Sequence, residues 1–193
     1  MKKFFHDYSY SVVKMLINQI AIAIFGMSLT FATVSAHGDS ESFDTFTLIV
    51  SIFSALFYLF LIYNMAWEIG AKDKISVDVK KKPYRPYLGI VLSLLANIPN
   101  IILVTVYALT TFSGAEQAKG IVGLISCFAN GMYWGTMIVF KLQGFWVSFL
   151  IAIIPAVVAS GLAYFLGHKN FKFFGFITNK KPTVHYSFQA FEI

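Results

Sequence analysis

Residues 45–67 read TFTLIVSIFSALFYLFLIYNMAW, a run without a single charged side chain. An α-helix rises about 1.5 Å per residue, so about 20 apolar residues cross a hydrocarbon core roughly 30 Å thick. A helix on the surface of a soluble protein would be apolar on one face only. The run is therefore long enough, and apolar enough on all sides, to predict a transmembrane helix.

Four further segments share this character, at residues 12–35, 86–112, 120–140 and 144–166. Of the 193 residues, 58% are apolar and 12% are charged, against roughly 25% charged in ordinary soluble domains. The connections are too short to hold a soluble domain. We therefore expect an all-α integral membrane protein, a polytopic helical bundle of five hydrophobic segments that forms one domain over residues 1–193.

The first segment ends in Val34-Ser35-Ala36, which resembles a signal-peptidase site. Its apolar stretch is longer than the roughly 7 to 15 residues of a signal sequence, and this favours a helix that is retained. Cleavage stays the alternative. In both cases the loop that follows lies outside.

The distribution of basic residues predicts the orientation, because Lys and Arg near helix ends are retained on the cytoplasmic side. Lys2, Lys3 and Lys14 lie near the N-terminus, and the loop over residues 68–85 holds six further basic residues. We expect both regions in the cytoplasm and the protein in the cell (plasma) membrane as a multi-pass protein. The bias toward Lys over Arg, with abundant Phe, Ile and Asn, suggests a bacterial source.

The fourth segment, residues 120–140, leaves two topologies open. It holds four glycines, and Asn130 lies near its centre, where polar groups are costly. If it crosses, the interfacial tail at 167–193 lies outside and the basic residues divide ten inside to five outside. If it is re-entrant, the bundle has four crossings and the division is thirteen to two, which the charge rule favours.

Polar residues within the apolar segments form stripes at helical spacing. Ser93, Asn97 and Asn100 share one face of the third segment, and Pro99 predicts a kink beside them. Further candidates for the same polar cavity are Ser126, Asn130 and Tyr133 in the fourth segment, and Asn18 and Gln19 in the first. Such groups either bond directly between helices or line a wet site near the membrane midplane.

Small residues predict close helix packing in the last two segments. Gly131 and Gly135 form a small-x-x-x-small pair, and Ala152, Ala156 and Ser160 continue such a face. Small side chains let helix backbones approach where lipid provides no hydrophobic drive. We therefore expect the fourth and fifth segments to pack against each other.

Charged residues at the membrane surface predict simple roles. Glu68 and Lys72 are four residues apart, which predicts a local pair. Lys80, Lys81, Lys82 and Arg85 form a basic cluster that predicts contact with anionic lipid headgroups, at about 1 kcal/mol per charge, and not with nucleic acid.

No motif identifies a reaction. The lone Cys127 cannot form an internal disulfide, no phosphate-binding glycine loop or zinc motif is found, and we predict neither metal nor cofactor.

Three classes of function remain possible for this chain. The first is a non-catalytic membrane subunit that packs with itself, as a homo-oligomer, or with a membrane-protein partner. The second is a small-solute transporter or channel component, and the least favoured is a membrane enzyme. An enzyme would need Glu68, Asp73 or Glu116 within hydrogen-bonding reach of Ser or His.

Overall fold

Every secondary-structure element in the described part of the chain is a helix. The computed structural model describes residues 2–37, 43–79 and 83–171. Three of its helical stretches are long and apolar enough to cross a membrane, Asp7–Ala36, Asp44–Asp78 and Trp146–His168. Two bent helix pairs raise the number to as many as five if each pair is one span.

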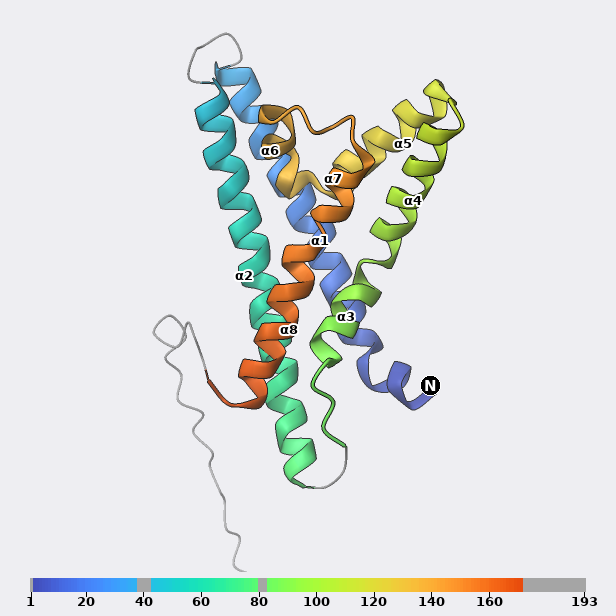
Figure 1. Ribbon diagram of the computed structural model, residues 1–193. Coiled ribbons are helices and arrows are strands. Elements are labelled where there is room, and N and C mark those ends of the chain that lie inside the picture. Colours follow the sequence, from blue (N-terminus) through green and yellow to red (C-terminus); the bar gives the residue numbers. More distant parts are fainter. Residues whose placement is uncertain (1, 38–42, 80–82, 172–193) are drawn as a thin grey trace, which may run out of the picture.

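Two long helices form the frame, α1 (Lys2–His37) and α2 (Phe43–Asp78), which pack along each other (Figure 1). Many large apolar side chains on them face outward, for example Ile24 and Leu56, each about three-fifths exposed. Such a surface suits lipid and not water. α2 continues well past Trp67, so much of the predicted basic loop at 68–85 is helical.

The third segment bends as the sequence predicts. α3 (Leu88–Ala96) and α4 (Ile98–Phe112) meet at Asn97 with a bend of 56°. Pro99 stands in the first turn of α4, where its missing N–H and fixed φ are tolerated. The predicted kink at this proline is confirmed.

The fourth segment bends more sharply and folds back. α5 (Glu116–Ala129) is followed by a short 3-10 helix, η1 (Gly131–Tyr133), and by α6 (Trp134–Val139), with a bend of 85°. α5 runs antiparallel to α4 until Asn130 reaches Asn100. The chain then returns, and the carbonyl of Gln143 accepts a hydrogen bond from the Tyr107 hydroxyl of α4 at 3.2 Å. The segment thus leaves and returns at one end of the bundle, the far end, which holds the last turns of α1 and α4 and lies toward the top of Figure 1.

The last segment is also divided. α7 (Trp146–Ile151) and α8 (Ile154–His168) are separated at Ala152–Ile153, and Pro155 lies in the first turn of α8. α8 ends beside α2, because Gly167 meets the carbonyl of Trp67. The end of α8 therefore lies with the end of α2 and the first turns of α1 and α3 (Figure 1). We call this the basic end, after Lys72, Lys74, Arg85 and Lys169.

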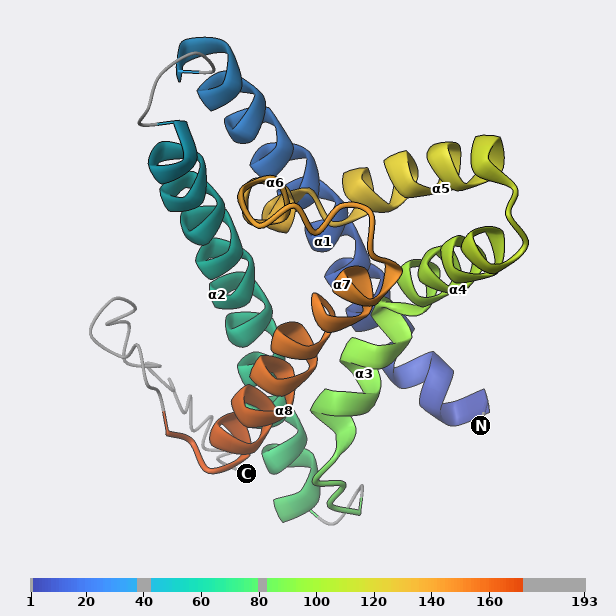
Figure 2. The ribbon, with the colours of Figure 1, turned by 45° about the horizontal axis from the view of Figure 1, so that its top comes forward.

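The bundle holds two apolar cores of different size. The larger is formed by α1, α2, α3 and α8, with Met15, Tyr58, Leu92 and Tyr164 almost fully buried. The smaller lies between α4, α5, α6 and α7, around Tyr107 and Phe149. In both views the outer ends of α4 and α5 point away from α1 and α2 (Figures 1 and 2).

The small residues lie at close helix contacts, but their partners differ from the expected ones. A Cβ atom on Gly131 would meet the carbonyl of Ala23 in α1, and one on Gly135 would approach the carbonyl of Thr47 in α2 at 2.8 Å. In α8, the Ser160 hydroxyl donates to the carbonyl of Gly89 in α3 at 2.8 Å.

The fourth and fifth segments therefore do not pack mainly against each other, which corrects the sequence-based expectation. α8 packs most extensively on α2, with Ala156 buried in the larger core. The reason is the 85° bend, which turns η1 and α6 toward α1 and α2. Ala152 lies between α7 and α8, next to the smaller core.

We predict that Gly131→Ala destabilises the fold. The added methyl group would collide with the α1 backbone, which cannot move aside as a flexible side chain can, and overpacking of this kind costs about 1 to 3 kcal/mol. The matched control is Gly120→Ala, because no atom lies within 4 Å of the added methyl group. Thermal unfolding in detergent should show a lower melting temperature for Gly131→Ala alone. Equal melting temperatures would contradict the close approach of η1 to α1.

Candidate functional site

The helix breaks bring polar side chains from three segments together in the interior. Gln19 of α1 donates to the side-chain oxygen of Asn97 at 3.1 Å. Asn100 and Asn130 donate to each other, with both Nδ2 to Oδ1 distances at 2.9 Å. All four side chains are buried. We call Gln19, Asn97, Asn100 and Asn130 the amide layer.

The amide layer also bonds the backbone carbonyls beside the breaks. Asn97 donates to the carbonyl of Ser93, and Asn130 donates to the carbonyl of Ser126, each at 2.9 Å. Each of these carbonyls also accepts a backbone hydrogen bond, from the N–H of Asn97 at 3.0 Å and from the N–H of Asn130 at 3.1 Å. The side-chain amide of each asparagine therefore bonds its own helix and a second segment at once.

The remaining candidates of the predicted polar cavity are arranged differently. Asn18 lies apart from Gln19 and donates to the sulfur of Met65 at 2.8 Å. The hydroxyl of Ser126 donates to the carbonyl of Val122. The hydroxyl of Tyr133 is buried and has no hydrogen-bond partner within the described ranges. The stripes thus converge through the amides of Gln19, Asn97, Asn100 and Asn130. Asn18 instead bonds α2, Ser126 bonds its own helix through its hydroxyl, and Tyr133 packs without a hydroxyl partner among the described residues.

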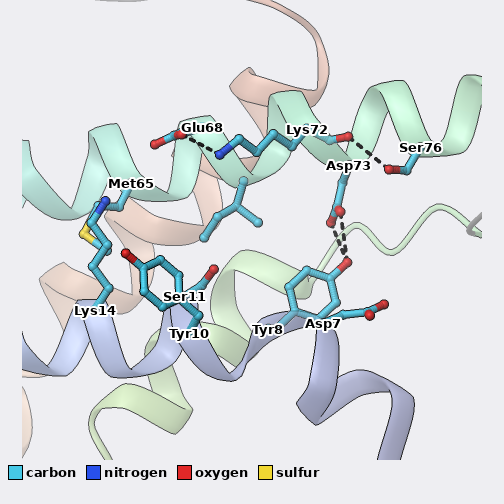
Figure 3. A pocket seen from close by; sticks show the side chains of 11 residues that line it. Asp7, Tyr8, Tyr10, Ser11, Lys14, Met65, Glu68, Lys72, Asp73 and Ser76 are labelled. Carbon is cyan, nitrogen blue, oxygen red and sulfur yellow. Dashed lines mark hydrogen bonds and ion pairs between the residues drawn. The ribbon is translucent and has the colours of Figure 1, made fainter.

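A second polar region lies at the basic end, in a cavity of about 260 Å³ between α1 and α2 (Figure 3). Its walls carry charged side chains of both signs. Those on α1 are Asp7 and Lys14, and those on α2 are Glu68, Lys72 and Asp73. The lining is completed by Tyr8, Tyr10 and Ser11 of α1 and by Met65, Ile69 and Ser76 of α2. We call this space the interfacial cavity, because it lies just beyond the expected crossings at 12–35 and 45–67.

Glu68 and Lys72 form the predicted local pair. The Lys72 Nζ atom lies 2.6 Å from the Glu68 Oε1 atom, and both side chains are largely exposed. The hydrogen bond from Lys72 holds the pKa of the Glu68 carboxyl below its usual value. Because the pair is exposed, it contributes little to stability.

Asp73 is different, because it is buried and its partners are neutral. Its side chain is 8% exposed. The Tyr8 hydroxyl of α1 donates to both carboxylate oxygens at 2.9 Å, and the Tyr164 hydroxyl of α8 donates to Oδ2 at 3.1 Å. The carboxylate therefore joins the first, second and last helices of the bundle.

From the sequence, we expect Asp73 in the loop over residues 68–85, beyond the second segment, and its burial is not predicted. The error came from ending the second segment at Trp67, whereas α2 continues to Asp78. Helical spacing could have predicted the burial of Asp73, because Ile62, Ala66 and Asp73 fall on one helix face at i, i+4 and i+11. All three side chains are buried in the structure.

The carboxylates that a membrane enzyme would need are bonded to other partners in the described part of the chain. Glu68 pairs with Lys72, Asp73 with two tyrosines, and Glu116 with Lys119 at 3.6 Å. None of these contacts joins a carboxylate to Ser or His. Within the described residues, no group of three or more His, Cys, Asp or Glu side chains is placed to hold a metal ion.

Only some of the residues that we predict to contact lipid lie within the described part of the chain. Arg85 is exposed at the basic end. Lys80, Lys81 and Lys82 lie outside the described residues, as do residues 172–193 of the predicted interfacial tail.

Comparison of the chain with protein-family models, with curated proteins and with solved structures gives no match. The function must therefore be argued from the chain's own geometry.

We predict that Asn100→Leu and Asn130→Leu are each more harmful alone than together. A single substitution leaves the partner amide buried with unmade hydrogen bonds, which costs more than replacing both groups. Thermal unfolding in detergent should show a larger loss of stability for each single variant than for the double variant. A double-mutant cycle should therefore give a coupling energy larger than the loss in either single variant. Strict additivity would contradict a direct bond between the two side chains.

Proposed function

We propose that the chain crosses the membrane four times, with residues 116–143 as a re-entrant segment that enters and leaves at the far end. Three observations support this. The fourth segment bends by 85° and returns to α4 near Tyr107. The end of α8 lies beside Trp67 at the basic end. The resulting division of basic residues, thirteen to two, is the one that the charge rule favours.

In this arrangement the N-terminus, the basic loop and the tail face the cytoplasm, and the membrane is the cell membrane. The argument is electrostatic, since Lys and Arg near the ends of crossings are retained on the cytoplasmic side. Lys72, Lys74, Arg85 and Lys169 all lie at this end. Lys119 and Lys141 are the two basic residues toward the opposite end.

Within the membrane, the protein acts as a non-catalytic subunit that packs with itself or with a membrane partner. One observation supports this best: the buried amides at the helix breaks bond to each other and to the carbonyls beside them. Polar groups used in this way hold helices together. A subunit of this kind contributes a rigid shape to an assembly.

A small-solute transporter or channel component is the second candidate. The observation in its favour is that two broken helices, at Asn97 and Asn130, meet in the same amide layer. Discontinuous helices that meet near the membrane midplane are typical of substrate sites in transporters. In this case the amides would exchange their mutual bonds for bonds to a solute during transport.

Cysteine accessibility tests the topology. In a Cys127→Ala background, we expect Lys169→Cys and Lys74→Cys to resist a membrane-impermeant thiol reagent on intact cells. Ser113→Cys, in the α4–α5 turn at the far end, should react. Labelling of Lys169→Cys from outside, with Lys74→Cys protected, would mean five crossings. Labelling of both, with Ser113→Cys protected, would reverse the orientation.

Native mass spectrometry of the full chain from a mild detergent tests the proposed subunit role. We expect a second membrane chain, either another copy or one partner at fixed stoichiometry, and we expect Asn100→Leu/Asn130→Leu to preserve that assembly. A lone monomer in several detergents would contradict the proposal. Loss of a cellular phenotype in the double variant, with assembly and melting temperature intact, would favour the transporter instead.

A further inference from the structure

The interfacial cavity contains a buried carboxylate, that of Asp73, which has no cation bonded to it among the described residues. Asp73 accepts hydrogen bonds from Tyr8 and Tyr164, and both donors are neutral phenols. Hydrogen bonds from neutral groups satisfy the oxygens but leave the charge uncompensated, and a buried charge is costly unless it is paired. Since Asp73 also lines the cavity, a cationic group placed in that space would supply the missing partner.

The cavity also has a defined charge order along the bundle axis. α1 and α2 run in opposite directions, so Asp7 and Asp73 lie toward the outer rim, and Lys14 and Met65 lie deeper (Figure 3). Lys72 lies between them and donates to Glu68, whose carboxylate lies on the side of Met65, so the deeper part of the cavity holds two lysines and one carboxylate. A ligand that follows this order carries its positive group at the rim and its negative group below.

Zwitterionic phospholipids carry their charges in this order. In such a lipid the phosphate lies next to the glycerol and the ammonium group lies further from the membrane. We propose that the interfacial cavity binds a phosphate-bearing amine, the headgroup of a zwitterionic phospholipid. Asp73 contacts the ammonium group, and Lys14 and Lys72 contact the phosphate.

The size and the position of the interfacial cavity agree with a phospholipid headgroup as the ligand. Pockets for drug-sized molecules span roughly 300 to 1,000 Å³, so a cavity of about 260 Å³ suits a headgroup better than a large solute. The cavity lies just beyond the expected crossings, at headgroup level. The assignment rests on the proposed membrane placement, which the cysteine experiment tests without reference to lipid.

Binding is measured by native mass spectrometry of the full chain in neutral detergent, titrated with three probes. These are short-chain phosphatidylethanolamine, short-chain phosphatidylglycerol and free phosphoethanolamine. We expect the ethanolamine lipid to bind about tenfold more tightly than the glycerol lipid, which has no ammonium group. Asp73→Asn keeps an oxygen for the tyrosines and should remove most of this preference, whereas Asp78→Asn, on an exposed position of the same helix, should leave it unchanged.

A second variant keeps the test decisive if Asp73→Asn does not fold. Lys14 is exposed, so Lys14→Gln should fold normally and weaken binding of both lipids, with Lys74→Gln as its control outside the cavity. Equal affinity for the two lipids would overturn the proposal, as would identical behaviour of Lys14→Gln and Lys74→Gln. If free phosphoethanolamine binds as tightly as the lipid, the lipid source is wrong and the ligand is a soluble phosphate-bearing amine.

Discussion

The structure depends on one constraint: the polar atoms of a side chain buried among apolar groups must find their hydrogen-bond partners within the protein. In water the solvent would bond these atoms, but in lipid or in a dry core only the protein can. The third and fourth segments break at Asn97 and Asn130, and each asparagine bonds a carbonyl of its own helix. Each side chain also makes a hydrogen bond to another segment: Asn97 accepts from Gln19, and Asn130 bonds with Asn100. The same residues therefore lie at the bends and bond the bent segments to their neighbours.

The same reasoning applies at the basic end, where the buried group carries a full charge. Asp73 is shielded from solvent, and its oxygens are occupied by Tyr8 from the first helix and Tyr164 from the last. The amide layer and the Asp73 contacts are thus two polar junctions in a bundle whose other contacts are mostly apolar. One joins the broken helices near the middle of the molecule, and the other joins the two ends of the described chain.

The amino-acid sequence predicts much of this architecture for physical reasons that are local. Long uncharged runs require helices, Pro99 requires a break, and the spacing of Ser93, Asn97 and Asn100 places them on one face. The pairing of segments is not local. Gly131 and Gly135 predict a close approach to some helix, but an 85° bend decides that α1 and α2 are the helices they meet. Asp73 was missed because its burial depends on where α2 ends and on a tyrosine some ninety residues later in the chain.

The contact between α2 and α8 also bears on how the protein is made. α2 packs more extensively on α8 than on any other helix, and Gly70 and Gly167 let the two backbones come together. A ribosome completes α2 long before it reaches Ile154, where α8 begins. During that interval the face of α2 that will receive α8 has no permanent neighbour from its own chain. Closure of the bundle is therefore a late event, and a nascent chain that stops before α8 lacks the most extensive helix–helix contact among the described helices.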